Sequence, residues 1–153
     1  MTNMTQEAKA YFQALKKERS DLEPNSIERE CNDIALAYCY FKGHGVSTNY
    51  VKALEYFLAS NSHYELAFMY LGGFGTDIDL VKAKVYMDLF LKELEVDKLP
   101  ESLQRNIHLF NEMIKNPDVF NYRASVNLIR NTIKNKVLNH VHFTGDGIEF
   151  RIS

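Results

Sequence analysis

The sequence is poor in cysteine and has no long apolar run. Only Cys31 and Cys39 occur among its 153 residues. If both lie on one helix, their eight-residue separation places them about 12 Å apart, which is too far for a disulfide. Free thiols are typical of a reducing compartment. No segment reaches the length of a membrane span, and residues 1–17 lack the apolar run of a secretory signal. The composition therefore predicts a cytoplasmic protein.

Neither sign of charge dominates. The formal net charge is −2, with 11 Lys/Arg against 15 Asp/Glu in residues 1–100 and 7 against 5 in residues 101–153. This asymmetry is too small to indicate a membrane partner, and it makes nucleic acid an improbable one. A hydrophobic content of 46% is sufficient for a core. We therefore expect one domain over residues 1–153.

Motifs for catalysis or cofactor binding are scarce. The Gly-x-Gly segments lack the Gly-Lys-Ser/Thr of a phosphate loop, and each follows an expected helix, so they predict helix ends. His140 and His142 would share one strand face, but no third metal ligand lies nearby in sequence. No Ser-His-Asp arrangement is recognisable. We expect no catalytic residue, no metal and no cofactor.

The chain contains an internal repeat with an offset of thirty residues. Nine positions are identical in the two copies without a gap. The first copy reads Leu36-Ala37-x-x-Tyr40-x-x-Gly43-x-Gly45 and then Val51-Lys52-Ala53-x-x-Tyr56; the second reads Leu66-Ala67-x-x-Tyr70-x-x-Gly73-x-Gly75 and then Val81-Lys82-Ala83-x-x-Tyr86. Such a period is typical of a solenoid of stacked supersecondary units.

Helix signals divide the chain into five segments. Apolar residues at helical spacing and cap residues predict helical hairpins, and a final alternation of apolar and polar residues predicts strands. The segments are a leading helix (4–20), repeat one (26–60), repeat two (62–95), a divergent third helical hairpin (101–139) and a terminal β-hairpin (141–152). Within the repeats we expect helices to about Lys42, from Asn49 to about Ser60, over 62–72, and from Asp79 to about Glu95. The fold class is an all-α, short α/α solenoid ending in a small β-hairpin.

The repeated string resembles the Sel1-like repeat, an α/α solenoid motif related to the tetratricopeptide repeat. The resemblance covers residues 27–95. It implies that the repeated Leu, Ala and Tyr residues form the helix cores, that the glycines form the turns, and that the protein binds other proteins without catalysis. The thirty-residue period is shorter than the family's usual one.

The resemblance also implies a binding surface. In such solenoids the first helix of each pair lines the concave side, so first-helix residues outside the core motif are candidates for protein binding. They are Asn32, Tyr38, Cys39, Glu65, Phe68 and Met69. The alternative is that Tyr38 and Phe68 pack on the preceding helix. A second candidate surface is the stretch from Val119 to Gly145, which has no acid and carries Arg123, Arg130, Lys134 and Lys136. It is either a solvated helix face or a patch for an acidic protein or RNA.

Some bacterial immunity proteins, which neutralise a toxin delivered by a neighbouring cell, carry repeats of this kind. A short protein with no second domain resembles a dedicated inhibitor more than a scaffold. We therefore predict an immunity protein that binds a toxin. The alternatives are an adaptor or effector that binds a host or regulatory protein, an RNA-binding protein, or an unrecognised hydrolase.

Overall fold

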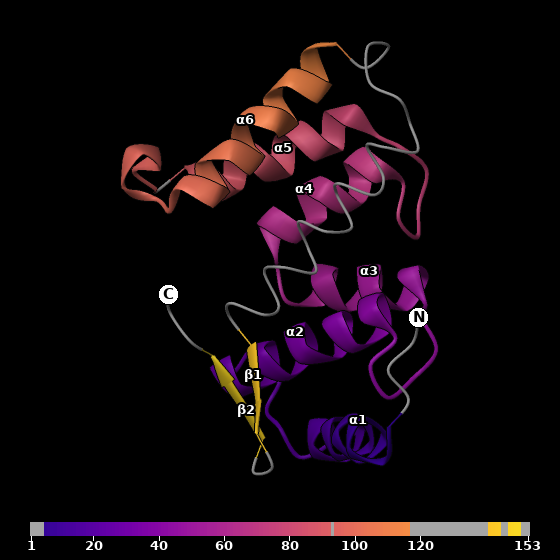
Figure 1. Cartoon of the computed structure of the whole chain (residues 1–153). Helices are drawn as coiled ribbons and strands as arrows, with labels where there is room; N and C mark the ends of the chain where they lie inside the picture. The colour runs from indigo at the N-terminus through magenta and orange to yellow at the C-terminus, as the bar shows by residue number, and fades with distance from the viewer. Residues whose placement is uncertain (1–4, 93, 117–140, 145–146, 151–153) are drawn as a thin grey trace. The chain divides into compact units, whose positions relative to one another are not determined.

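The computed structural model describes residues 5–92, 94–116, 141–144 and 147–150 (Figure 1). The elements in these ranges are mainly α-helices, as the repeat predicts. They are α1 (Gln6–Arg19), α2 (Ile27–Lys42), α3 (Tyr50–Ala59), α4 (His63–Gly72), α5 (Leu80–Leu91), the 3₁₀ helix η1 (Val96–Lys98), α6 (Glu101–Lys115), and the strands β1 (Val141–Thr144) and β2 (Gly147–Phe150).

The chain divides into two compact units, and the boundary falls between the two repeats. Unit 1 comprises Met1–Ser62 with Lys134–Ser153 and contains α1, α2, α3, β1 and β2; unit 2 comprises His63–Ile133 and contains α4, α5, η1 and α6. The expectation of one domain over residues 1–153 stays a prediction.

The repeat hairpins form where the sequence predicts them, because their ends are capped by side chains. Asn49 accepts a hydrogen bond from the Lys52 backbone N–H at 3.0 Å, and Asp79 accepts the equivalent one from Lys82 at 3.0 Å. Both bonds satisfy amide groups that have no partner within the helix. The second helices of both repeats therefore begin in the same way.

The turn between the helices is also repeated in detail. Gly43 and Gly73 end the first helices in the left-handed conformation, with φ of 72° and 70°. Beyond them, the Asn49 N–H donates to the Tyr40 carbonyl at 2.8 Å, and the Asp79 N–H donates to the Tyr70 carbonyl at 3.0 Å. The same backbone bonds thus return the chain in both hairpins.

Two tyrosines hold each hairpin together. Tyr40 stacks on Tyr56 with ring centroids 5.8 Å apart, and Tyr70 stacks on Tyr86 at 5.6 Å; both pairs have an interplanar angle of 9°. Ala53 and Ala83, which precede the second tyrosines by one helical turn, are fully buried. Small side chains there let the two helices approach closely enough for the rings to stack.

The leading helix shares a pattern with the second helices of the repeats, which the offset of thirty residues does not reveal. Its Ala8-x-x-Tyr11-Phe12 matches Ala53-x-x-Tyr56-Phe57 of α3. The alanines and phenylalanines of both segments are buried. In unit 1, Phe12 and Leu15 join Ala35, Leu36 and Cys39 in one core cluster. α1 therefore packs on α2 with the same residue types that the second helix of a repeat uses.

The end of α5 differs from its prediction. The helix was expected to reach about Glu95, but it ends at Leu91, with Lys92 as its C-cap. The Leu94 N–H bonds to the Leu91 carbonyl at 3.1 Å, a three-residue spacing that tightens the chain beyond the α-helix. Glu95 then precedes η1.

The divergent third segment is described over its first helix. Ile107, Phe110 and Met113 of α6 are buried, while Leu103 and Ile114 are half-buried. The second helix predicted for this hairpin lies outside the described residues. β1 and β2 pair antiparallel, with Val141 opposite Phe150 and Thr144 opposite Gly147. The terminal β-hairpin over 141–152 includes residues outside the described ranges and stays a prediction.

A comparison of two glycine substitutions tests the packing of α1. Gly45 and Gly73 both have positive φ, but an added Cβ at Gly45 would overlap the Ala8 backbone carbonyl, whereas at Gly73 it would lie 2.9 Å from Cγ1 of the exposed Ile78 side chain. We expect Gly73→Ala to lower the free energy of unfolding by about 1–2 kcal/mol and Gly45→Ala by about 3 kcal/mol or more. Urea denaturation measures both. Equal losses would contradict the close approach of α1 to this turn.

Candidate protein-interaction surface

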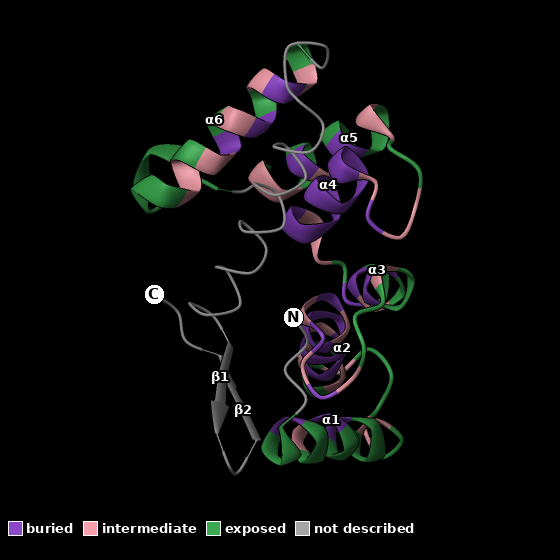
Figure 2. Cartoon of the chain, turned by 45° about the vertical axis from the view of Figure 1, so that its right-hand side comes forward, coloured by how far each residue is buried: buried purple, intermediate pink, exposed green. Residues whose placement is uncertain are grey.

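The six first-helix residues predicted to line a groove are core residues in the described structure. The exposed fractions of Asn32, Tyr38, Cys39, Glu65, Phe68 and Met69 are all 4% or less. Figure 2 shows α4, which carries three of them, in purple along nearly its whole length. Their contact with a partner stays a prediction, and it requires that the side chains covering them move.

Both aromatic residues pack inside the protein, but the contacts observed are with later helices and not with the preceding helix. Tyr38 meets Phe57 of α3 edge to face at 5.2 Å, so it lies between the two helices of its own hairpin. Phe68 contacts Phe110 of α6 at 5.3 Å. α6 contains none of the repeated residues, so the repeat pattern could not predict that α6 covers Phe68. Aromatic pairs of this geometry stabilise a core beyond their buried area.

Asn32 links two helices of unit 1. Its side-chain Nδ2 donates to the Leu15 carbonyl of α1 at 3.1 Å. Its Oδ1 atom is buried and accepts no hydrogen bond in the described part of the chain. Because a buried amide is costly unless it is hydrogen-bonded, the bond to Leu15 fixes the register of α1 on α2.

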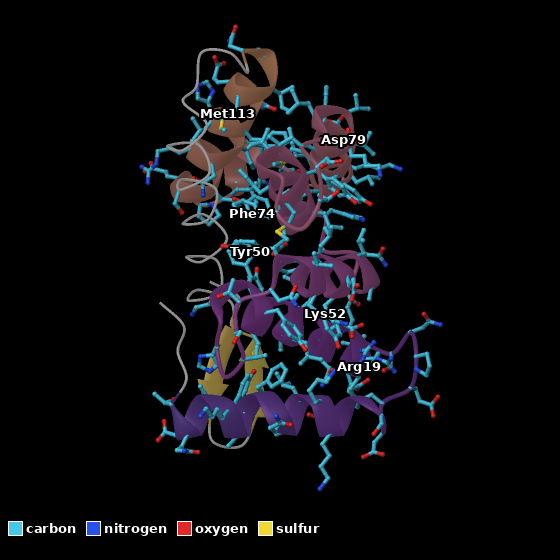
Figure 3. The ribbon with its side chains drawn as sticks, turned by 90° about the vertical axis from the view of Figure 1, so that its right-hand side faces the viewer. Arg19, Tyr50, Lys52, Phe74, Asp79 and Met113 are labelled. Atoms are coloured by element: carbon cyan, nitrogen blue, oxygen red, sulfur yellow. The ribbon has the colours of Figure 1, made fainter. Side chains whose placement is uncertain are left out.

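The sequence did not reveal an ion cluster between α1 and α2. Asp33, whose side chain is almost fully buried, forms an ion pair with Arg19, and Arg29 lies 3.9 Å from the same carboxylate oxygen. Burial raises the pKa of the Asp33 carboxyl, and the two guanidinium groups oppose that rise. Arg19 also lies over the Tyr56 ring, 5.2 Å from its centroid. Figure 3 shows Arg19 beside α2.

This cluster leaves a negatively charged surface next to it. Arg19 and Arg29 are the only cations among residues 18–33, and both are directed to Asp33. The exposed carboxylates of the same stretch are Glu18, Asp21, Glu23, Glu28 and Glu30, and we call the last four the acidic loop. Among them Ile27 is 76% exposed. An apolar side chain surrounded by carboxylates has the composition of an interface with a polar rim.

Unit 2 has a different exposed surface on α5. Val81, Val85 and Leu89 follow one another at four-residue spacing and are 75%, 51% and 43% exposed, and Ile78 before the helix is 49% exposed. We call these four residues the α5 stripe. A comparison of the two repeats contains the signal for this stripe: the equivalent positions of the first repeat are Thr48, Val51, Glu55 and Ala59. Only one of those four is a large apolar residue.

The remaining candidates give no site in the described residues. Arg123, Arg130 and Lys134 of the predicted basic surface lie outside them. Among the side chains that the structure describes, no group of three or more His, Cys, Asp and Glu residues is placed to hold a metal ion. No helix in the described ranges is long and apolar enough to cross a membrane.

The hairpins, their repeated turns and the stacked tyrosines define an α/α repeat protein. The Sel1 repeat family matches residues 34–60 and 60–89, so the chain contains two tandem Sel1 repeats. No curated protein and no solved structure matches it. Sel1 repeats generally mediate protein–protein interaction, and a non-catalytic binding module fits the observed fold. The resemblance read from the sequence is confirmed.

Thiol labelling tests whether Cys39 lies in the core. Burial raises the pKa of the Cys39 thiol to about 12, and its side chain has no exposed area. Cys31 is half-buried, and burial together with Glu30 and Glu28 raises its pKa as well. Because the thiolate is the reacting form, we expect a maleimide to label Cys31 slowly and Cys39 only after unfolding. Mass spectrometry of the peptides separates the two sites, and native labelling of Cys39 at the rate of Cys31 would contradict its burial.

Proposed function

We propose that this protein is a bacterial, cytoplasmic immunity protein that binds a cognate toxin in a fixed ratio and neutralises it. The observation that carries the proposal is how the repeated residues are used. The repeated tyrosines, alanines and turn glycines pack or turn the chain in both hairpins. What remains for function among the described residues is the outer surface, and on this proposal that surface acts by binding.

The charge of that surface supports a cationic partner. The acidic loop is exposed, whereas the two arginines of the same stretch are held by Asp33. Complementary charge raises the association rate, because it guides the partner before contact. A toxin domain that acts on nucleic acid has a positively charged surface, and it fits this chemistry.

A preformed surface also suits tight inhibition. Each hairpin is fixed by its own capping bonds and stacked rings, so little conformational entropy is lost when a partner binds. Ile27, which is exposed among the carboxylates, would provide the apolar contact that slows dissociation.

Co-expression with the product of the adjacent gene tests the proposal. We expect a stable complex of one-to-one or two-to-two stoichiometry, and growth of cells that the toxin alone would kill. Size-exclusion chromatography with light scattering measures the complex, and plating efficiency measures protection. A toxic neighbouring product that forms no complex and is not neutralised would contradict the immunity function.

A charge-reversal variant tests the acidic loop. We expect Glu23→Lys with Glu28→Lys to slow association with the toxin by roughly tenfold at low salt, and the difference should shrink as salt screens the charges. Stopped-flow fluorescence measures the rate. The control is Asp97→Lys with Glu101→Lys, which changes the net charge equally on exposed residues of unit 2. Equal slowing by both variants would show that only net charge matters and that the loop is not the steering surface.

A further inference from the structure

The α5 stripe makes this helix apolar on two opposite sides. Ala83 and Met87 are buried within the protein, whereas Val81, Val85 and Leu89 are exposed. A helix on the surface of a soluble protein normally has one apolar side and one polar side. The second apolar side of α5 therefore requires an explanation outside its own hairpin.

The repeat fold does not require this stripe. Val85 and Leu89 replace Glu55 and Ala59 of α3, while the tyrosine stack and the helix cap are the same in both hairpins. The packing of a hairpin is therefore achieved without apolar side chains at these positions. Their presence on α5 indicates a contact specific to the second repeat.

We propose that the α5 stripe binds the same stripe of a second copy of this chain, with the two α5 helices antiparallel. Pairing of this kind about a two-fold axis at Val85 places Val85 opposite itself and Val81 opposite Leu89 of the second copy. The helical part of the stripe, from Val81 to Leu89, spans about 12 Å, and Ile78 lies before the start of α5. Val81, Val85 and Leu89 then face apolar side chains of the second copy, whereas Ile78 lies opposite Lys92.

The charges beside the stripe complement each other in this arrangement. Lys84 and Asp88 lie on one flank and are both exposed. An antiparallel pair brings like flanks together, so Lys84 of each copy comes within about 3 Å along the axis of Asp88 of the other. At the ends of the stripe, Lys92 of one copy approaches Asp77 of the other. Both are exposed. On that flank the two Lys84 residues also lie about 3 Å apart along the axis, so two attractive Lys84–Asp88 contacts stand against one repulsive contact. The three aspartates near the stripe are balanced by Lys82, Lys84 and Lys92, so the stripe has no net positive charge to attract an anionic lipid surface, and this favours a second copy.

The size of the contact sets its strength. One pair of helices lies at or below the low end of specific interfaces, so we expect a weak dimer with a dissociation constant of about 10–100 µM. Sedimentation equilibrium of the full chain over about 5–500 µM covers this range. A chain that stays monomeric at the highest concentration would overturn the proposal.

A lysine in the centre of the stripe gives the first test. In Val85→Lys two like charges would meet at the two-fold axis, and we expect the dissociation constant to rise at least tenfold. The circular dichroism spectrum should stay the same, because residue 85 points outward. The control is Val51→Lys, which places a lysine at a valine of α3 that is 54% exposed. Association that survives Val85→Lys, or that falls equally in Val51→Lys, would overturn the proposal.

Exchange of the flanking charges gives an independent test. Lys84→Asp alone places four aspartates on the joined flanks, and Asp88→Lys alone places four lysines there. We expect each variant to self-associate at least fivefold more weakly than the wild type, and an equimolar mixture of the two to recover association. A mixture that stays as weak as its components would show that the helices do not pair in this way. Binding of the wild type to vesicles with one-third phosphatidylserine, lost in Val85→Lys, would assign the stripe to lipid instead.

Discussion

The stacked pair of tyrosines within each hairpin is the interaction on which the rest of this structure depends. Tyr40 on Tyr56 and Tyr70 on Tyr86 have the same interplanar angle, and their centroid distances differ by only 0.2 Å (5.8 against 5.6 Å). This geometry requires that the second helix return at a fixed distance from the first. Buried alanines permit the approach, and left-handed glycines with the following backbone bonds reverse the chain. The repeated residues are therefore those that define one hairpin geometry.

Because the residues that both repeats share form the hairpins, the residues that differ between the repeats determine the chemistry of the exposed surfaces. Lys52 pairs with Glu55 at 3.5 Å, whereas Lys82 lies over the Tyr70 ring at 5.3 Å, since the residue equivalent to Glu55 is Val85. The same replacement creates the centre of the α5 stripe. In unit 1, the arginines that neutralise Asp33 leave the acidic loop exposed. The two units thus present surfaces of different chemistry on similar hairpins.

The sequence predicted the elements of the fold well and the candidate site poorly, and the reason is physical. Caps such as Asn49 and Asp79 and the glycine turns act locally, so local patterns reveal them. Burial depends on residues distant in sequence. Asn32 is hydrogen-bonded to Leu15, seventeen residues earlier, and Phe68 packs on Phe110. Neither Leu15 nor Phe110 belongs to the repeated pattern. The ion pair of Arg19 and Asp33 likewise joins residues fourteen positions apart that no periodicity relates.

A double-mutant cycle tests the central role of the tyrosine stack most directly. The free energies of unfolding would be measured for Tyr70→Leu, Tyr86→Leu and the double variant, and for the equivalent variants of Tyr40 and Tyr56. We expect a coupling energy of about 0.5–1.5 kcal/mol in each hairpin, with the two values equal within error, because the two stacks have the same geometry. A coupling near zero in both hairpins, or in only one of them, would contradict the claim that one repeated interaction fixes both.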